Sequence, residues 1–167
     1  RADAICGPER FAQGQELILI RALEVDTEFG HIITIGLDEY TTGYFRVRDL
    51  RRAVLDAGGY MIAAHPFRNL FNPPPYNRNL LYQEPSHYPS TPQEAISHPV
   101  FELLDDVEVV NGANTEKENR FALEVATLLG TPGSGGSDAH STHGIGRGVT
   151  AFHGEVRSEA EFLEALR

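Results

Sequence analysis

The run Tyr60-Met61-Ile62-Ala63-Ala64-His65-Pro66 is the stretch that decides the fold class. Its first five residues are apolar, follow the pair Gly58-Gly59 and end at a proline, a pattern typical of a buried β-strand. Residues 47–57 carry apolar side chains at helical spacing up to the same glycine pair. We therefore predict a helix that leads into a buried strand.

The segments on either side repeat this alternation. Further strands are predicted at 17–23, 31–37, 107–110 and 149–152, and further helices at 115–130 and from 158 onward. Strands that alternate with helices indicate parallel βαβ units, in a barrel or in an open sheet. Both architectures bind ligands at the carboxyl ends of the strands, so polar residues at those positions are candidates for a site.

Residues 67–99 interrupt the alternation. Seven of the ten prolines lie there, together with Tyr76, Tyr82 and Tyr88, although Thr91-Pro92-Gln93-Glu94 predicts a short helix. A loop of this length between folded elements is more often a lid or a binding loop than a linker.

Composition limits the class of protein. The 167 residues suit one domain, and 14 Lys and Arg against 24 Asp and Glu give a net charge of −10. We expect neither nucleic acid nor an anionic membrane surface as a partner. Cys6 is the single cysteine, which excludes an intrachain disulfide framework, and no apolar run approaches the roughly 20 residues that span a bilayer. The expected compartment is the cytoplasm. Because the chain starts at Arg1 and not at Met, we expect a fragment of a longer chain.

Carboxylates and imidazoles lie at or near successive strand ends: Glu24, His65, Glu108, Asp138 and His140. Imidazole nitrogen and carboxylate oxygen together suit Zn²⁺, Mn²⁺ or Fe²⁺ and leave positions open for water. Taken singly, each has an ordinary explanation as a solvated carboxylate or a turn residue. Their joint position favours a metal site.

Two further residues lie near the same rim. Arg68 follows His65 by three positions and has the geometry to anchor a phosphate, although it could equally be an ordinary exposed arginine. His31 begins the second predicted strand, and it either points into the rim or packs beneath it.

Four motifs in order resemble the PHP (polymerase and histidinol phosphatase) superfamily. They are Leu23-Glu24-Val25 followed by Gly30-His31-Ile32, then Ala64-His65-Pro66-Phe67-Arg68, then 107–112, and finally Gly136-Ser137-Asp138-Ala139-His140. The resemblance extends over residues 17–148 and is most specific in the Ala-His-Pro and Ser-Asp-x-His elements.

The resemblance implies a fold and a set of roles. The fold is an α/β distorted (β/α)7 TIM-like barrel with two or three divalent metal ions, Mn²⁺, Fe²⁺ or Zn²⁺, that hydrolyses phosphoesters. Glu24 would bridge the metals, and His65, Asp138 and His140 would be further ligands. Arg68 would hold the substrate phosphate.

The chain also departs from the family pattern. The opening His-x-His and a histidine from the second βα unit are missing, and Asn114 lies where some relatives have a histidine ligand. We therefore expect residues 1–167 to be a single PHP-like domain incomplete at its N-terminus.

The function predicted from these residues is hydrolysis of a small phosphate ester at a di- or tri-metal centre. Glu24 and Asp138 would be catalytic, and Arg68 and His31 would bind the substrate. Two alternatives remain: an amidohydrolase-like metal hydrolase, and a PHP-like structural or interaction module without catalytic activity.

Overall fold

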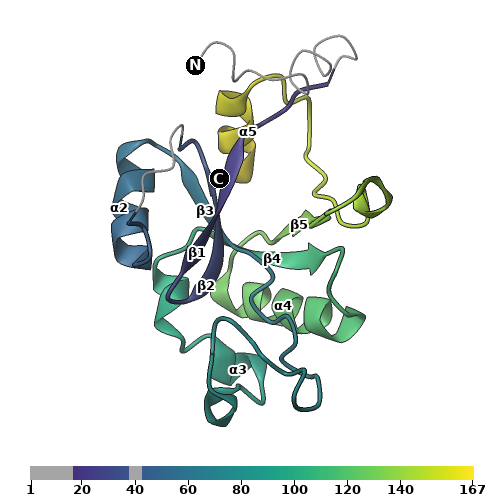
Figure 1. The fold of residues 1–167 in the computed structure, drawn as a ribbon. Coiled ribbons are helices and arrows are strands. Elements are labelled where there is room, and N and C mark those ends of the chain that lie inside the picture. The colour runs from purple at the N-terminus through teal and green to yellow at the C-terminus, as the bar shows by residue number, and fades with distance from the viewer. Residues whose placement is uncertain (1–16, 38–42) are drawn as a thin grey trace.

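A five-stranded sheet runs through the molecule in chain order, β1-β2-β3-β4-β5 (Figure 1). The computed structural model describes residues 17–37 and 43–167. β1 and β2 pair antiparallel, as do β2 and β3, whereas β3, β4 and β5 pair parallel. The strands are β1 Ala22–Thr27, β2 Gly30–Ile35, β3 Tyr60–Ala63, β4 Asp106–Asn111 and β5 Ser134–Gly136.

The predicted (β/α)7 barrel is wrong for the described residues. Their sheet is mixed and open, because β1 and β5 lie at its two edges and do not pair with each other. The reason is local. A turn of two residues, Glu28 and Phe29, joins β1 to β2, whereas a parallel crossover needs a dozen residues or more. The Thr27 hydroxyl donates to the Gly30 carbonyl (2.6 Å), and Gly30 takes a positive φ of 84° that closes the turn.

The strands at the two edges of the sheet also differ from the prediction. β1 covers 22–27 and not 17–23, because pairing with β2 extends it into the polar residues. The predicted strand at 149–152 is absent, and β5 forms instead within the glycine-rich stretch. The hydroxyl of Thr150 accepts from Gly135 N (2.8 Å) and donates to Gly135 O (2.9 Å). The side chain of Thr150 therefore bonds to β5 in the way that the backbone of a neighbouring strand would.

The predicted helices are confirmed. They are α2 Val47–Asp56, α3 Pro92–Ala95, α4 Glu116–Leu129 and α5 Glu159–Leu166, with short 3-10 helices η2 Pro85–His87, η3 Pro99–Glu102 and η4 Thr142–Gly144. α4 begins with the reciprocal capping box of Thr115 and Glu118 and ends at Gly130, whose φ is 73°.

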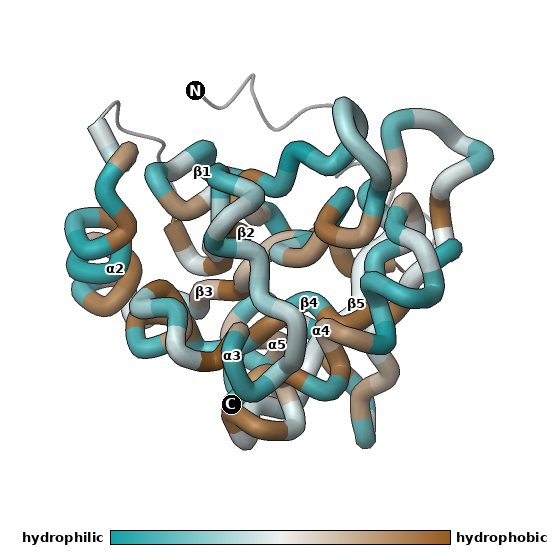
Figure 2. The backbone as a smooth tube through the Cα atoms, turned by 90° about the horizontal axis from the view of Figure 1, so that it is seen from below, coloured by the Kyte–Doolittle hydropathy of each residue, from teal (hydrophilic) through white to brown (hydrophobic). Residues whose placement is uncertain are grey.

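Helices cover both faces of the sheet. α2 and α4 pack on one face in the larger core cluster, and α5 packs on the other face through Leu166. All four residues of β3 are buried, because this strand lies between the two layers. Hydrophobic segments concentrate around these strands and helices, and hydrophilic ones lie on the outer turns (Figure 2).

Residues 67–99 form turns, η2 and α3, with no strand. Leu70 and Leu81 are buried in the larger cluster, and Tyr82 and Tyr88 pack against it. The segment is therefore part of the folded body. In the described part of the chain, no helix is both long and apolar enough to cross a membrane.

Candidate metal centre

The β1–β2 hairpin places Glu24 beside His31. Asp26 is paired with His31 and Glu24 with Ile33, so Glu24 and His31 are diagonal neighbours on one face of the sheet. Nδ1 of His31 lies 2.7 Å from Oε1 of Glu24. The proximity follows from the antiparallel register.

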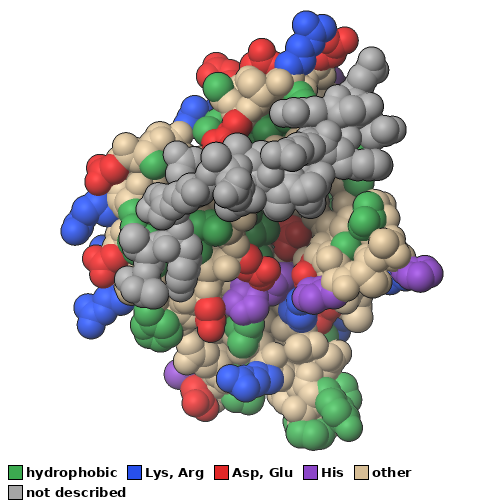
Figure 3. Space-filling view, turned by 45° about the horizontal axis from the view of Figure 1, so that its top comes forward, with side chains coloured by type: hydrophobic (Ala, Val, Ile, Leu, Met, Phe, Trp, Pro, Cys, Tyr) green, Lys and Arg blue, Asp and Glu red, His purple; other side chains and the backbone are tan. Residues whose placement is uncertain are grey.

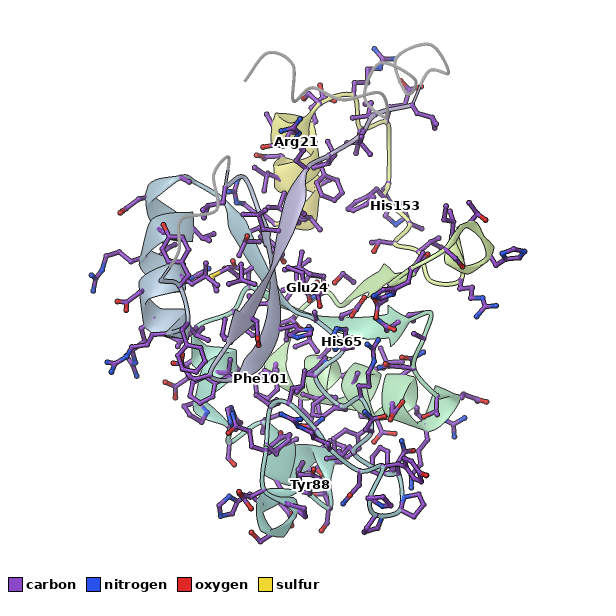
Figure 4. All side chains as sticks on the ribbon, viewed as in Figure 1. Arg21, Glu24, His65, Tyr88, Phe101 and His153 are labelled. Carbon is purple, nitrogen blue, oxygen red and sulfur yellow. The ribbon has the colours of Figure 1, made fainter. Side chains whose placement is uncertain are left out.

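His65 joins this pair from the end of β3 (Figure 4). Its Nε2 lies 3.0 Å from Oε1 of Glu24, and its ring meets that of His31 edge to face, with centroids 5.1 Å apart. The His65 backbone has a positive φ of 34°, a conformation that costs energy for a non-glycine residue and that concentrates at functional sites.

One donor atom from each of Glu24, His31 and His65 lies within 4.8 Å of the others. Around a tetrahedral Zn²⁺ with bonds of about 2.0–2.1 Å, donor atoms lie roughly 3.3 Å apart, so small movements would bring the three to one ion. Nδ1 of His31 is buried, lies 2.7 Å from Oε1 of Glu24 and has no other hydrogen-bond partner among the described residues. A buried imidazole nitrogen that faces a carboxylate fits a pair of metal ligands.

The charge of the group also suits a cation. The hydrogen bond with His65 lowers the pKa of Glu24 to about 2 against the opposing effect of partial burial, and the charges of His31 and His65 add to the lowering. Glu24 is therefore ionised at neutral pH, as a metal ligand must be.

Glu108 supports His65 from β4. Its buried carboxylate accepts from the backbone N of His65 (2.7 Å) and from Nδ2 of Asn111 (3.0 Å). Burial raises the pKa of Glu108, despite these hydrogen bonds. A Cβ at Gly136 would lie 2.7 Å from Oε1 of Glu108, so the glycine makes room for the carboxylate.

Arg68 is held by three acceptors. Its Nε donates to Asn114 Oδ1 (2.9 Å), and its Nη2 donates to Asn111 Oδ1 (2.8 Å) and Asp138 Oδ2 (2.5 Å). Nη1 makes no hydrogen bond to the described residues. The guanidinium is thus fixed in orientation with one nitrogen free.

Asp138 and His140 lie close together but differ in exposure. The side chain of Asp138 is 13% exposed and contacts Arg68, whereas that of His140 is 88% exposed. Nδ1 of His140 lies 3.1 Å from the Asp138 carbonyl and 3.6 Å from Oδ1 of the Asp138 carboxylate. Asp138 has a positive φ of 47°, so the segment is not the extended strand that the sequence analysis assumed for this pair. Burial would raise the pKa of Asp138, but the hydrogen bond and charge of Arg68 outweigh it and the pKa is lowered.

A cavity of about 310 Å³ adjoins the centre. His31, His65 and Arg68 line it together with Asn69, Arg78 and a set of apolar residues. On the face shown in Figure 3, histidine side chains gather beside acidic and basic ones near the middle. The cavity gives a ligand access to the imidazoles.

The sequence contained signals for the contacts of His31, which was predicted to bind the substrate, and of Glu108, whose role was left open. The short connection at 28–30 forces an antiparallel hairpin, which by register brings His31 toward Glu24. Glu108 is a charged residue between Val107 and Val109 in a buried strand, and such a residue needs partners. Asn111, which bridges Glu108 and Arg68, carried no such signal.

Comparison with known proteins supports the resemblance over the last third of the chain. The family model described as PHP-associated matches residues 116–167, which include α4, β5 and α5. No curated protein and no solved structure matches the chain. Residues 116–167 are thus similar to the PHP-associated domain, which is consistent with the resemblance over this part of the chain.

Proposed function

We propose that this protein is a metal-dependent phosphoesterase that hydrolyses a small phosphate ester. The observation that carries the proposal is that one donor atom from each of Glu24, His31 and His65 lies within 4.8 Å of the others. The relation to PHP proteins, a hydrolase-related family, supports the reaction class.

Glu24, His31 and His65 would hold one divalent ion, Mn²⁺, Fe²⁺ or Zn²⁺. Three protein ligands of mixed nitrogen and oxygen leave a coordination position open, as in catalytic sites. When bound, such an ion polarises a phosphoryl oxygen and lowers the pKa of water. Asp138 and His140 are the proposed ligands of a further ion, which would compete with Arg68 for the Asp138 carboxylate.

The remaining residues orient the substrate. Arg68 offers the N–H groups of Nη1 to the phosphate, while Asn111 and Asn114 hold its plane in position. Glu108 fixes the His65 backbone and is a positioning residue. The packed segment 67–99 limits the access of water to the cavity.

Metal binding is the first test. The full chain, purified without chelator, is examined by elemental analysis and then titrated with Mn²⁺ and Zn²⁺ by calorimetry. We expect the protein to bind a metal ion, and we expect Glu24→Gln and His65→Gln each to weaken the metal affinity at least about tenfold. Removing a residue that only orients a metal ligand already weakens metal affinity by about this factor. Asp49→Asn, which removes an exposed carboxylate on α2, is the matched control and keeps the affinity.

Phosphate release from 4-nitrophenyl phosphate is the second test, since it is the reaction itself. We expect metal-dependent release that is lost in Glu24→Gln. Turnover of amides or lactones without phosphate release would favour the amidohydrolase-like alternative. A chain that neither contains nor acquires a transition metal would instead be the inert module.

A further inference from the structure

The cavity beside the metal centre has apolar walls from three parts of the fold. Phe29 comes from the β1–β2 turn, Leu80 and Leu81 from the segment 67–99, and Val100 from η3. The two histidines and Arg68 line the same cavity. A group attached to a phosphate at Arg68 can therefore enter apolar surroundings.

Arg78 gives the cavity a second cation. It is exposed, lines the cavity and makes no side-chain hydrogen bond or ion pair with the described residues. Arg51 and Arg120, by contrast, are paired with carboxylates. In a chain of net charge −10, an open guanidinium at a cavity has the chemistry to recognise an anion.

Asn79 fixes the backbone next to Arg78. Its side chain is 1% exposed and uses its full hydrogen-bonding capacity: Nδ2 donates to the carbonyls of Pro66 (2.8 Å) and Arg68 (2.9 Å), and Oδ1 accepts from the backbone N of Leu81 (3.0 Å) and Tyr82 (2.9 Å). This link joins the segment that carries Arg78 to the segment that carries His65 and Arg68. The two arginines are thus held on one rigid frame.

We propose that this cavity binds the leaving group of the phosphate ester, and that this group carries a ring and a second anionic substituent held by Arg78. The inference rests on the proposed function and names its substrate class. A cavity of about 150 Å³ holds benzene, so about 310 Å³ has room for a ring and its substituent.

Binding of three phosphonates tests the inference without turnover. Methylphosphonate, phenylphosphonate and 4-phosphonobenzoate are titrated into the full chain by calorimetry, with and without Mn²⁺. We expect phenylphosphonate to bind about tenfold tighter than methylphosphonate, because the ring is buried. We expect 4-phosphonobenzoate to bind about tenfold tighter again, because its carboxylate can accept a charge-assisted hydrogen bond from Arg78. A tenfold gain in affinity is about the contribution of one such hydrogen bond.

Single substitutions show which residue is responsible for each gain in phosphonate affinity. Arg78→Gln loses the carboxylate gain, so that phenylphosphonate and 4-phosphonobenzoate bind with similar affinity. Leu80→Ser, at a partly exposed wall position, reduces the gain from the ring. Arg52→Gln on α2 removes the same charge from an exposed residue outside the cavity and leaves all three affinities unchanged.

Failure of the inference is distinct from failure of the proposed function. Equal effects of Arg78→Gln and Arg52→Gln, or no binding of the three phosphonates, would overturn the inference. The expected binding pattern without phosphate release from 4-nitrophenyl phosphate would overturn the proposed function and leave an anion-binding cavity. Phosphate release from 4-nitrophenyl phosphate, combined with phosphonate affinities that Arg78→Gln does not change, would overturn only the inference.

Discussion

Nη2 of Arg68 lies 2.5 Å from Oδ2 of Asp138, a contact that joins the segment after β3 to the segment after β5. The sequence assigned Arg68 to the substrate phosphate and Asp138 to a metal ion. In the structure the two side chains, 29% and 13% exposed, neutralise each other. A phosphate or a metal ion that binds here must compete with this ion pair.

Replacing Asp138 by Asn removes the charge from this pair. Arg68 keeps Asn111 and Asn114 as acceptors, so we expect the free energy of unfolding to fall by about 1.5–3 kcal/mol, the scale of one hydrogen bond to a charged group. Phosphate release should be abolished while the protein stays folded. Urea denaturation and the phosphatase assay measure the two effects.

The exposed pair Glu116–Arg120 on α4 provides the control. Glu116→Gln should change the free energy of unfolding by less than about 0.5 kcal/mol, since exposed ion pairs contribute little. Retained activity in Asp138→Asn would show that the assignment of Asp138 to the metal site is wrong.

Asn79→Ala should release the segment around Arg78. The substitution leaves two carbonyls and two N–H groups without their partners, and we expect a loss of about 2–4 kcal/mol. Limited proteolysis within residues 69–90, together with urea denaturation, measures the opening. Asn72→Ala, in the same segment but only partly buried, should cost less than about 1 kcal/mol. Equal effects of the two variants would contradict the role of Asn79.

His98 should make stability depend on pH. Burial lowers the pKa of His98 below the ordinary histidine value of 6.5, and its ring packs against Phe29 and Tyr82. As the pH falls below about 6.5, the unfolded chain binds a proton that the folded protein excludes, so this residue makes stability decrease. Urea denaturation at pH 7.5 and 5.5 measures the difference.

Asn is the informative replacement for His98. Nδ1 of His98 accepts from Val100 N (3.2 Å) at the start of η3, and an Asn oxygen can accept the same bond without titrating. The stability of His98→Asn should therefore fall less between pH 7.5 and 5.5 than that of the unsubstituted protein. The same fall in both proteins would exclude His98 as the source.

The helices and the central strand could be predicted because their signals are local. Capping residues fix the ends of α4, and the apolar run after Gly59 fixes β3. The resemblance predicted Glu24 and His65 as site residues, and the structure places their side chains in contact. The grouping of Glu24 with His31 was also accessible, since the short turn between them dictates the register.

The open sheet and the partners of Arg68 could not be read from local pattern. β5 contains only Ser134-Gly135-Gly136 and has no apolar periodicity, so it is a strand only because β4 pairs with it. The contact of Arg68 with Asp138 spans 70 positions and depends on that pairing.

The sequence by itself determined the helices, the β1–β2 hairpin and the set of residues able to bind metal, since propensity, capping and turn length act within a few residues. The short turn sets the pairing of Glu24 with His31, and only the tertiary structure decided which other residues meet. The turn at His65 brings its ring to Glu24 and His31. At Asp138 the carboxylate contacts Arg68, and His140 beside it stays 88% exposed, because side-chain direction follows from backbone conformation and not from spacing alone.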